Sequence, residues 1–210
     1  KMDINKLKRR ILELSQTVDA MHIAPAFSCL HIIVNLYRWV MNPEDIFLLS
    51  KGHGAMAHYV VLEELGILKN LDEYGKGWSL GAHPDKWTPG IHACTGSLGH
   101  GLPIAVGMAL ANRLMGDLGK IYALISDGEL QEGSTWESVM VAANLKLTNL
   151  HILVDNNDWT GLERISTTHP ATYPITDKFN AFGWEGYSIY TTIKGDGVWF
   201  MQDNPIWHYR

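Results

Sequence analysis

Several features that would indicate particular classes of protein are scarce or missing in this sequence. The only two cysteines, Cys29 and Cys94, do not form a Cys-x-x-Cys pair. We therefore expect no disulfide framework, and we expect the protein to occupy a reducing compartment. No uninterrupted apolar run reaches about 18 residues and no signal peptide opens the chain. The 22 acidic and 17 basic residues give a net charge of −5, without the basic patch typical of nucleic-acid binding. We therefore expect a cytoplasmic protein that binds neither nucleic acid nor a membrane.

The length and patterning of the sequence predict a single α/β domain spanning residues 1–210. Its 210 residues, 46% of them hydrophobic, suffice for one core. Apolar periodicity and turn residues predict helices over residues 4–20, 25–41, 55–65, 98–114, 136–145 and 176–181. Strands are expected at 47–50, 121–125 and 151–154, followed by a last β-rich stretch after the final helix. Residues 66–95, rich in Gly, Pro, Trp and His, read as one long functional loop.

The most informative motif places oxygen-bearing side chains after two neighbouring strands. Asp127-Gly128-Glu129 follows the strand at 121–125, and Asn157 follows the strand at 151–154, with a helix between them. In open parallel sheets, ligands bind at the carboxyl ends of the strands. Asp127 and Asn157 could there bind Mg²⁺, and the turn at Gly128 could receive a diphosphate. The alternative is that both segments are ordinary surface turns.

Histidines at glycine-rich turns form a second signal. They are His22, His53, His83 and His100. A histidine on such a turn can face a ligand, and its pKa lies near neutral pH, which suits general acid–base catalysis. A zinc site usually shows close pairs such as His-x₃-His, and these four residues contain none. Polar loops without a catalytic role remain the alternative.

These motifs resemble the diphosphate-binding, N-terminal part of transketolases, which use thiamine diphosphate. The resemblance rests on Ser126-Asp-Gly-Glu-Leu-Gln-Glu-Gly133, on Asn156-Asn157 and on the histidine turns. It implies a thiamine diphosphate-binding fold, in which a parallel sheet carries helices on both faces. Ser126 stands where the family has Gly, and His100 stands where it has Gln.

The resemblance also implies roles for individual residues. Side chains of Asp127 and Asn157 and the backbone carbonyl of Trp159 would bind Mg²⁺. His22, His53, His83 and His100 would be catalytic. Contacts to the cofactor would come from His53, Gly96, Leu98, Gly128, Glu129, Glu132, Asn157 and His208. Glu132 and Glu137 match acidic residues of a subunit interface, although both also suit a helix N-terminus, where the helix dipole favours negative charge.

Two parts of the family pattern are missing. The domain that binds the aminopyrimidine ring does not fit in 210 residues, so a C-terminal transketolase-like subunit is expected as partner, in a 2+2 assembly. In addition, Tyr187–Lys194 joins two strands that a helical crossover normally separates, and parallel neighbours need a connection of about a dozen residues. We therefore expect that the sequence leaves out a crossover segment near residues 190/191, and not that the protein itself has lost the crossover.

The expected function is transfer of a two-carbon ketol unit from a ketose, or ketose phosphate, to an aldehyde. Thiamine diphosphate and Mg²⁺ would be the cofactors, and the chain would be active only with its partner. Two alternatives remain open. One is a subunit of another thiamine diphosphate-dependent transferase or lyase, and the other is a non-catalytic relative with a binding or regulatory role.

Overall fold

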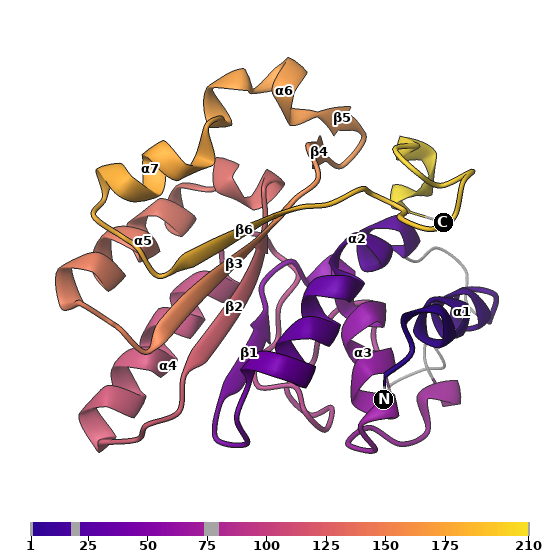
Figure 1. The fold of residues 1–210 in the computed structure, drawn as a ribbon, viewed down its shortest axis with the longest axis horizontal. Coiled ribbons are helices and arrows are strands. Elements are labelled where there is room, and N and C mark those ends of the chain that lie inside the picture. The colour runs from indigo at the N-terminus through magenta and orange to yellow at the C-terminus, as the bar shows by residue number, and fades with distance from the viewer. Residues whose placement is uncertain (1, 18–21, 74–79, 210) are drawn as a thin grey trace.

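Four parallel strands form the centre of the structure, in the order β1-β2-β3-β6 (Figure 1). The computed structural model describes residues 2–17, 22–73 and 80–209. The strands are β1 (Ile46–Leu49), β2 (Ile121–Ser126), β3 (Leu150–Asn156) and β6 (Tyr187–Thr191). This sheet, with helices on both faces, confirms the predicted fold class.

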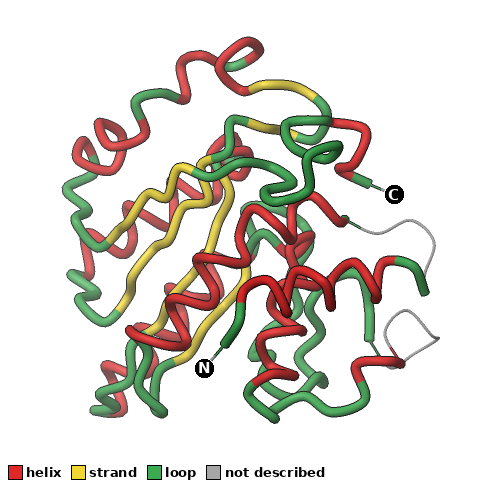
Figure 2. Tube along the Cα trace, turned by 45° about the vertical axis from the view of Figure 1, so that its right-hand side comes forward, coloured by secondary structure: helices red, strands yellow, loops and turns green. Residues whose placement is uncertain are grey.

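Helices cover both faces of the sheet, as the tube view also shows (Figure 2). On one face lie α1 (Ile4–Ser15), α2 (Ile23–Asn35) with its π-helical extension η1 (Leu36–Val40), and α3 (Ala55–Glu64). On the other lie α4 (Gly101–Met115), α5 (Gly133–Leu145) and α7 (Ile175–Ala181). The short elements are η2 (Gly52–Gly54), η3 (Leu71–Glu73), η4 (Gly128–Gln131), the ribbon β4 (Trp159–Thr160) and β5 (Glu163–Arg164), α6 (Ile165–Thr168), η5 (Pro170–Thr172) and η6 (Pro205–His208).

Two apolar cores explain why the strands are hydrophobic on both sides. Alternate residues of one strand point to opposite faces, so Phe47 and Leu49 pack with α1–α3, whereas Leu48 packs with α4 and α5. In β2, Tyr122 and Leu124 likewise join the first core. A strand buried on both faces has no polar side to expose, which is the pattern of parallel sheets.

The register brings the carboxyl ends of the strands to one edge. Ser126, the last residue of β2, lies opposite Asp155 of β3, and Asp155 lies opposite Tyr190 of β6. The Asp127 N–H then donates to the Asp155 carbonyl at 3.1 Å. Residues that follow three different strands are therefore neighbours at this edge.

Three expectations about the elements need correction. The first helix ends at Ser15, and residues 18–20 of its predicted span lie outside the described residues. The loop at 66–95 contains a 3₁₀ turn, η3, and its residues 74–79 are also outside the described part. The last β-rich stretch was too long, because β6 ends at Thr191. Beyond it, Gly195 and Gly197 adopt positive φ angles of 78° and 87° and turn the chain towards α2, where the Gly195 N–H donates to the Ala24 carbonyl.

One stretch of the described chain, Ile23–Val40, is long and apolar enough by composition to cross a membrane. Two thirds of it, 67%, is buried inside the protein, as in the core helix of a globular domain. It consists of α2 and η1, which pack between the sheet, α1 and α3.

A buried histidine on α3 gives a prediction about stability. His58 is 1% exposed, its Nε2 lies 2.8 Å from the Tyr37 hydroxyl, and burial lowers its pKa to about 3. In the unfolded chain its pKa returns to about 6.5. Below pH 6.5 only the unfolded state takes up this proton, so the stability due to neutral His58 is lost as pH falls, by up to about 1.4 kcal/mol per pH unit.

We expect a His58→Gln variant to show a smaller fall in unfolding free energy between pH 7 and pH 5 than the unmodified protein. Glutamine can still bond to Tyr37 but does not titrate. Urea unfolding followed by circular dichroism at several pH values measures the slope. Parallel curves for the two proteins would refute the assignment.

Candidate active site

The predicted site residues converge on a pocket of about 270 Å³ at the carboxyl edge of the sheet. Its walls come from η2, the turn before α4, the start of η4, the β4 turn and η6. The predicted residues that line it are His22, His53, His83, Gly96, Leu98, Gly128, Trp159 and His208. Segments more than 180 positions apart in the chain therefore meet at one site, as the strand-end rule for parallel sheets predicts.

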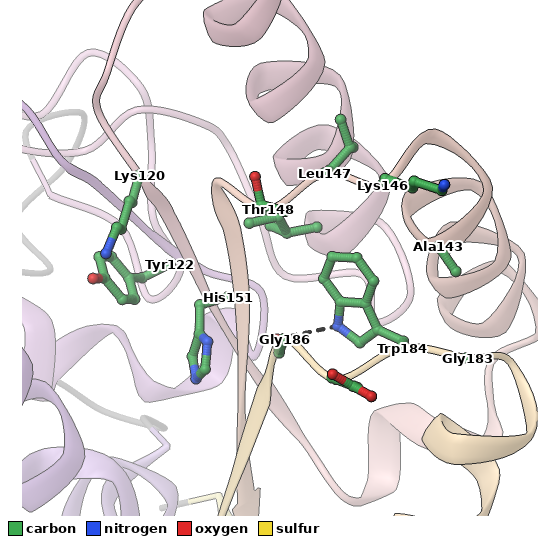
Figure 3. A pocket seen from close by; sticks show the side chains of 12 residues that line it. Lys120, Tyr122, Ala143, Lys146, Leu147, Thr148, His151, Gly183, Trp184 and Gly186 are labelled. Atoms are coloured by element: carbon green, nitrogen blue, oxygen red, sulfur yellow. Dashed lines mark hydrogen bonds between the residues drawn. The ribbon is translucent and has the colours of Figure 1, made fainter.

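A larger hollow of about 550 Å³ lies elsewhere, at the amino ends of β2, β3 and β6 (Figure 3). Lys120, Lys146 and Trp184 line it, and the Trp184 indole already donates to the Gly186 carbonyl at 3.1 Å. Ligands of parallel sheets bind at the opposite edge. Chemistry rather than volume therefore identifies the smaller pocket as the candidate site.

Four imidazole rings form one cluster in this pocket. The ring centroid of His22 lies 5.8 Å from that of His53, 5.4 Å from His83 and 5.2 Å from His208. His22 precedes α2, His53 lies in η2, His83 lies in the long loop and His208 ends η6. The structure thus brings together three of the predicted catalytic histidines and the predicted cofactor ligand His208.

Burial keeps these rings neutral. It lowers the pKa of His22 and of His83, and it lowers that of His208 to about 3. The pKa of His53 falls well below its ordinary value because of burial, with repulsion from the nearby Lys51 ammonium adding to it. At neutral pH each ring therefore offers one donor and one acceptor nitrogen rather than a positive charge.

The tautomer of His22 follows from its hydrogen bond. Its Nδ1 lies 3.1 Å from the His208 carbonyl oxygen, which can only accept. Nδ1 of His22 therefore carries the hydrogen, and Nε2 is left with a lone pair. A neutral imidazole held in this way is able to accept a proton.

Asp127 is fully buried behind the pocket and holds its turn together. Its carboxylate accepts from the N–H groups of Gly128 and Asp158, and the Tyr173 hydroxyl lies 3.3 Å from Oδ2. Burial and the neighbouring Asp155 carboxylate raise the pKa of Asp127 to about 7. A cation beside Asp127 would favour its ionised form.

The groups near Asp127 include oxygen donors of the type that a hard metal ion prefers. Asn157 is 8% exposed, and its Oδ1 accepts from the Trp159 N–H at 3.1 Å. The Trp159 carbonyl faces the Asp127 turn, because a Cβ added to Gly128 would lie 3.4 Å from its oxygen. Carboxylate, amide and carbonyl oxygens are the donors that Mg²⁺ prefers. No cluster of three or more His, Cys, Asp or Glu suited to a metal occurs among the described residues.

A buried ion pair that the sequence analysis missed lies under the pocket. Lys51 and Asp155 are each 0% exposed and directly bonded to each other. Lys51 also donates to Ser28 Oγ at 3.2 Å and to the Pro25 carbonyl at 3.3 Å, and Asp155 accepts from the Thr192 hydroxyl. Lys51 precedes the glycine-rich turn that carries His53, and Asp155 precedes Asn156-Asn157. Their positions beside these motifs were the only sign in the sequence that they belong to the site.

Lys194 is a second missed cation, on the C-terminal side. It is 2% exposed, and burial lowers its pKa to about 7. In the described part of the chain its ammonium donates to the Gly161 carbonyl at 2.6 Å and lies 5.2 Å from the Trp159 ring. Gly161 and Trp159 line the pocket, so this ammonium lies just behind the pocket wall.

Four other predicted residues lie away from the pocket lining. His100 is exposed at the start of α4, without a side-chain capping bond. Glu132 and Glu137 are exposed at and near the start of α5. Glu129 is fully buried, and burial raises its pKa to about 7. Its carboxylate accepts from Ser50 and from the Gly99 N–H, so both of these bonds are made inside the protein.

Comparison with known proteins gives the family. Residues 35–196 match the family model described as transketolase, thiamine diphosphate binding domain. The chain belongs to the transketolase family. This confirms the predicted resemblance, and the parallel sheet agrees with it.

Similar proteins include components of split transketolases. One of the subunits of the apulose-4-phosphate transketolase of Actinobacillus succinogenes is 36% identical over 243 residues, covering 97% of this chain and 88% of that protein. The 6-deoxy-6-sulfo-D-fructose transketolase subunit SqwG of Clostridium sp. MSTE9 is 35% identical over 198 residues, covering 88% of this chain and 72% of that protein. These names agree with the predicted resemblance to the N-terminal subunit of a split transketolase.

A solved transketolase has the same fold. The structure of the Leishmania mexicana enzyme superposes with a TM-score of 0.88 at 23% identity. The match covers 99% of this chain but 39% of that chain. The present chain therefore spans less than half of the length of the solved enzyme.

The buried ion pair gives a second stability prediction. Removing one partner of a buried pair leaves an uncompensated charge and typically costs about 3–5 kcal/mol. We expect Lys51→Met to lower the free energy of unfolding by about this amount. Lys6→Met, which removes an exposed ion pair with Glu64, is the control and should change stability little. Urea unfolding measures both, and equal effects would refute the structural role of the pair.

Proposed function

We propose that this chain is the diphosphate-binding subunit of a transketolase that uses thiamine diphosphate and Mg²⁺. The enzyme would transfer a two-carbon ketol unit from a ketose or ketose phosphate to an aldehyde. The observation that carries the proposal is the placement of Asp127, Asn157 and the Trp159 carbonyl beside a pocket lined by four neutral histidines. The family membership supports the cofactor, and the named relatives support a sugar-derived substrate.

The cofactor and the metal have a suitable set of binding groups in this chain. Asp127, Asn157 and the Trp159 carbonyl would hold Mg²⁺, and the Gly128 turn would lie beside the diphosphate. Gly96 allows the His83 ring to pack closely against the backbone of this pocket wall, since a Cβ would come within 3.0 Å of that ring. Behind this region lie the buried side chains of Lys194 and of Lys51, whose charge is paired with Asp155. When bound, thiamine diphosphate supplies the carbon that carries the ketol unit.

The histidines would move protons on the substrate. His22 presents an unprotonated Nε2, because its Nδ1 bonds to the His208 carbonyl. His53 and His83 are close enough to share one substrate with it. Neutral rings can both donate to and accept from hydroxyl groups, which a ketose carries on neighbouring carbons. These residues would therefore orient the substrate and transfer its protons.

Activity would depend on a partner chain. The pocket of about 270 Å³ is smaller than the roughly 300–1,000 Å³ usual for small-molecule sites, as expected of half a cofactor site. The relatives are themselves named as single subunits of transketolases, which supports a separate second subunit. We propose a C-terminal subunit carrying the pyrimidine-binding domain, in a 2+2 assembly.

An exposed apolar surface supports such an assembly. The outer sides of α4 and α5, adjacent in Figure 1, carry large hydrophobic side chains. They include Ile104, Leu114, Met115, Met140 and Val141, of which Leu114 and Met115 are 76% and 72% exposed. Large exposed apolar patches mark protein interfaces, and we propose that these side chains belong to one. Glu137, for which an interface role is predicted, is also exposed on α5.

We also propose that a crossover segment near residues 190/191 is missing from the printed sequence. The match to the A. succinogenes protein spans 243 residues, more than the 210 of this chain, so that relative has additional residues inside the matched region. β6 is an edge strand whose Tyr190 is 38% exposed. An intact mass near 23.5 kDa for the natural protein would contradict the proposal.

The metal assignment is tested by binding. We expect Asp127→Ala to weaken Mg²⁺-dependent binding of thiamine diphosphate by at least about 100-fold, because groups that merely support a ligand already contribute 10–100-fold. Isothermal titration of the chain mixed with its partner measures this. Asp177→Ala, an exposed carboxylate on α7, is the matched control and should bind normally. Unchanged binding by Asp127→Ala would refute the assignment.

Turnover distinguishes the enzyme from a non-catalytic relative. The mixed subunits should consume a ketose phosphate in the presence of an aldehyde, and the isolated chain should not. Full activity of the chain alone would refute the partner requirement. Cofactor binding without any turnover by the assembled subunits would favour the non-catalytic alternative.

A further inference from the structure

Three loops at the carboxyl edge of the sheet each form one wall of the pocket. The first, after β1, carries His53. The second, before α4, carries Gly96 and Leu98. The third begins at the last residue of β2, Ser126, and carries Gly128. Because the three loops come from different parts of the chain, contacts between them must fix their relative positions.

Glu129 connects all three loops. Its Oε1 accepts both from the Ser50 hydroxyl, at the end of β1, and from the Gly99 N–H at 2.9 Å, in the loop before α4. Its own N–H lies 3.2 Å from Ser126 Oγ in the third loop, and its carbonyl accepts from the Thr135 hydroxyl at 3.0 Å. The residue is 0% exposed, so water does not compete for these bonds.

The loop before α4 has little freedom at this contact. Gly99 has a φ of 79°, and a Cβ there would lie 2.5 Å from Ser134 Oγ. A Cβ on Gly101 would lie 2.3 Å from Ser50 Oγ. Close approach on both sides means that a shift at Gly99 would move the backbone of the whole turn.

That turn in turn supports two histidine-bearing segments. A Cβ on Gly96 would come within 3.0 Å of the His83 ring, and a Cβ on Gly52 within 2.7 Å of the Gly96 nitrogen. Gly52 precedes His53 in η2. A shift of Gly99 would therefore also displace the segments that carry His53 and His83.

We propose that Glu129 is a positioning residue that holds the loop before α4 against β1 and the Asp127 turn, and so sets the spacing of the pocket walls. The expected effect on cofactor binding rests on the proposed function, whereas the role of Glu129 in holding the loop does not. Glu129 acts through Gly99 and Ser50 and does not touch the ligand.

One carboxylate oxygen is enough for this role. Oε1 makes both side-chain bonds, whereas Oε2 is buried without a hydrogen-bond partner in the described structure. Glutamine has the same shape and keeps one acceptor oxygen. Glu129→Gln should therefore preserve the loop, and Glu129→Ala should release it.

Amide hydrogen exchange of the chain alone tests the structural part. In Glu129→Ala, exchange across residues 96–101 should rise by at least about tenfold, because the Gly99 N–H loses its buried acceptor. Glu129→Gln should exchange at nearly the unmodified rate. Val139→Ala, a cavity in the α5 core away from the pocket, is the control for lost stability. Unchanged exchange in Glu129→Ala, or an equal rise in Val139→Ala, would overturn the proposal.

Ser50→Ala provides a second route if Glu129→Ala fails to fold. It removes one of the two donors and should raise exchange at 96–101 to a lesser extent. Adding it to Glu129→Ala should have almost no further effect, since residues that share one network are not additive. Independent, additive effects of the two substitutions would contradict the linkage.

Binding of Mg²⁺ and thiamine diphosphate to the chain with its partner tests the functional part. We expect Glu129→Ala to weaken binding by about 10–100-fold, as for other groups that support ligand-bearing segments, and Glu129→Gln to stay close to the unmodified value. Normal binding by Glu129→Ala would overturn this part. If the unmodified assembly does not bind the cofactor, the proposed function fails, whereas the exchange result still decides whether Glu129 holds the loop.

Discussion

The carboxyl edge of the sheet depends on one buried ion pair. Lys51 follows β1 and Asp155 belongs to β3, and both are fully removed from water. Burying an isolated charge costs several kcal/mol, so neither residue can leave the other without a large penalty. Ser28 and the Pro25 carbonyl add bonds from α2, and Thr192 adds one from the chain after β6. The ion pair thereby links four segments: the turn after β1, the end of β3, α2 and the chain after β6.

Charges near the pocket add to the effect of burial on its histidines. Lys51 and Lys194 both oppose protonation of His53 and His208, in addition to the burial that keeps these rings neutral. An anionic ligand beside these histidines would favour their protonated form and so raise their pKa. On the proposed function, binding a diphosphate would therefore bring the imidazoles closer to the pH at which they exchange protons most effectively.

Much of the site could be predicted from local sequence because it consists of turns after strands. Asp127 and Asn157 follow apolar segments whose strand character is evident, and His22, His53 and His83 lie at turns. The buried roles of Lys51 and Glu129 could not be predicted, since lysine and glutamate at loops usually lie in solvent. Their burial results from the register of β1, β2 and β3, which is a property of the folded sheet. His100, predicted from its glycine-rich turn, lies exposed at the start of α4 instead of in the pocket lining.

On the proposed function, this chain supplies one half of the cofactor site. A diphosphate-binding side would need fixed oxygen and nitrogen atoms, and buried bonds through Lys51, Asp155 and Glu129 provide such rigidity. Rigid groups lose little entropy when a ligand binds, so they favour binding through preorganisation. The remaining wall would come from a second chain, whose association must then supply the contacts that this pocket lacks. Cofactor binding and assembly of the two chains would be thermodynamically linked, each strengthening the other by the same factor.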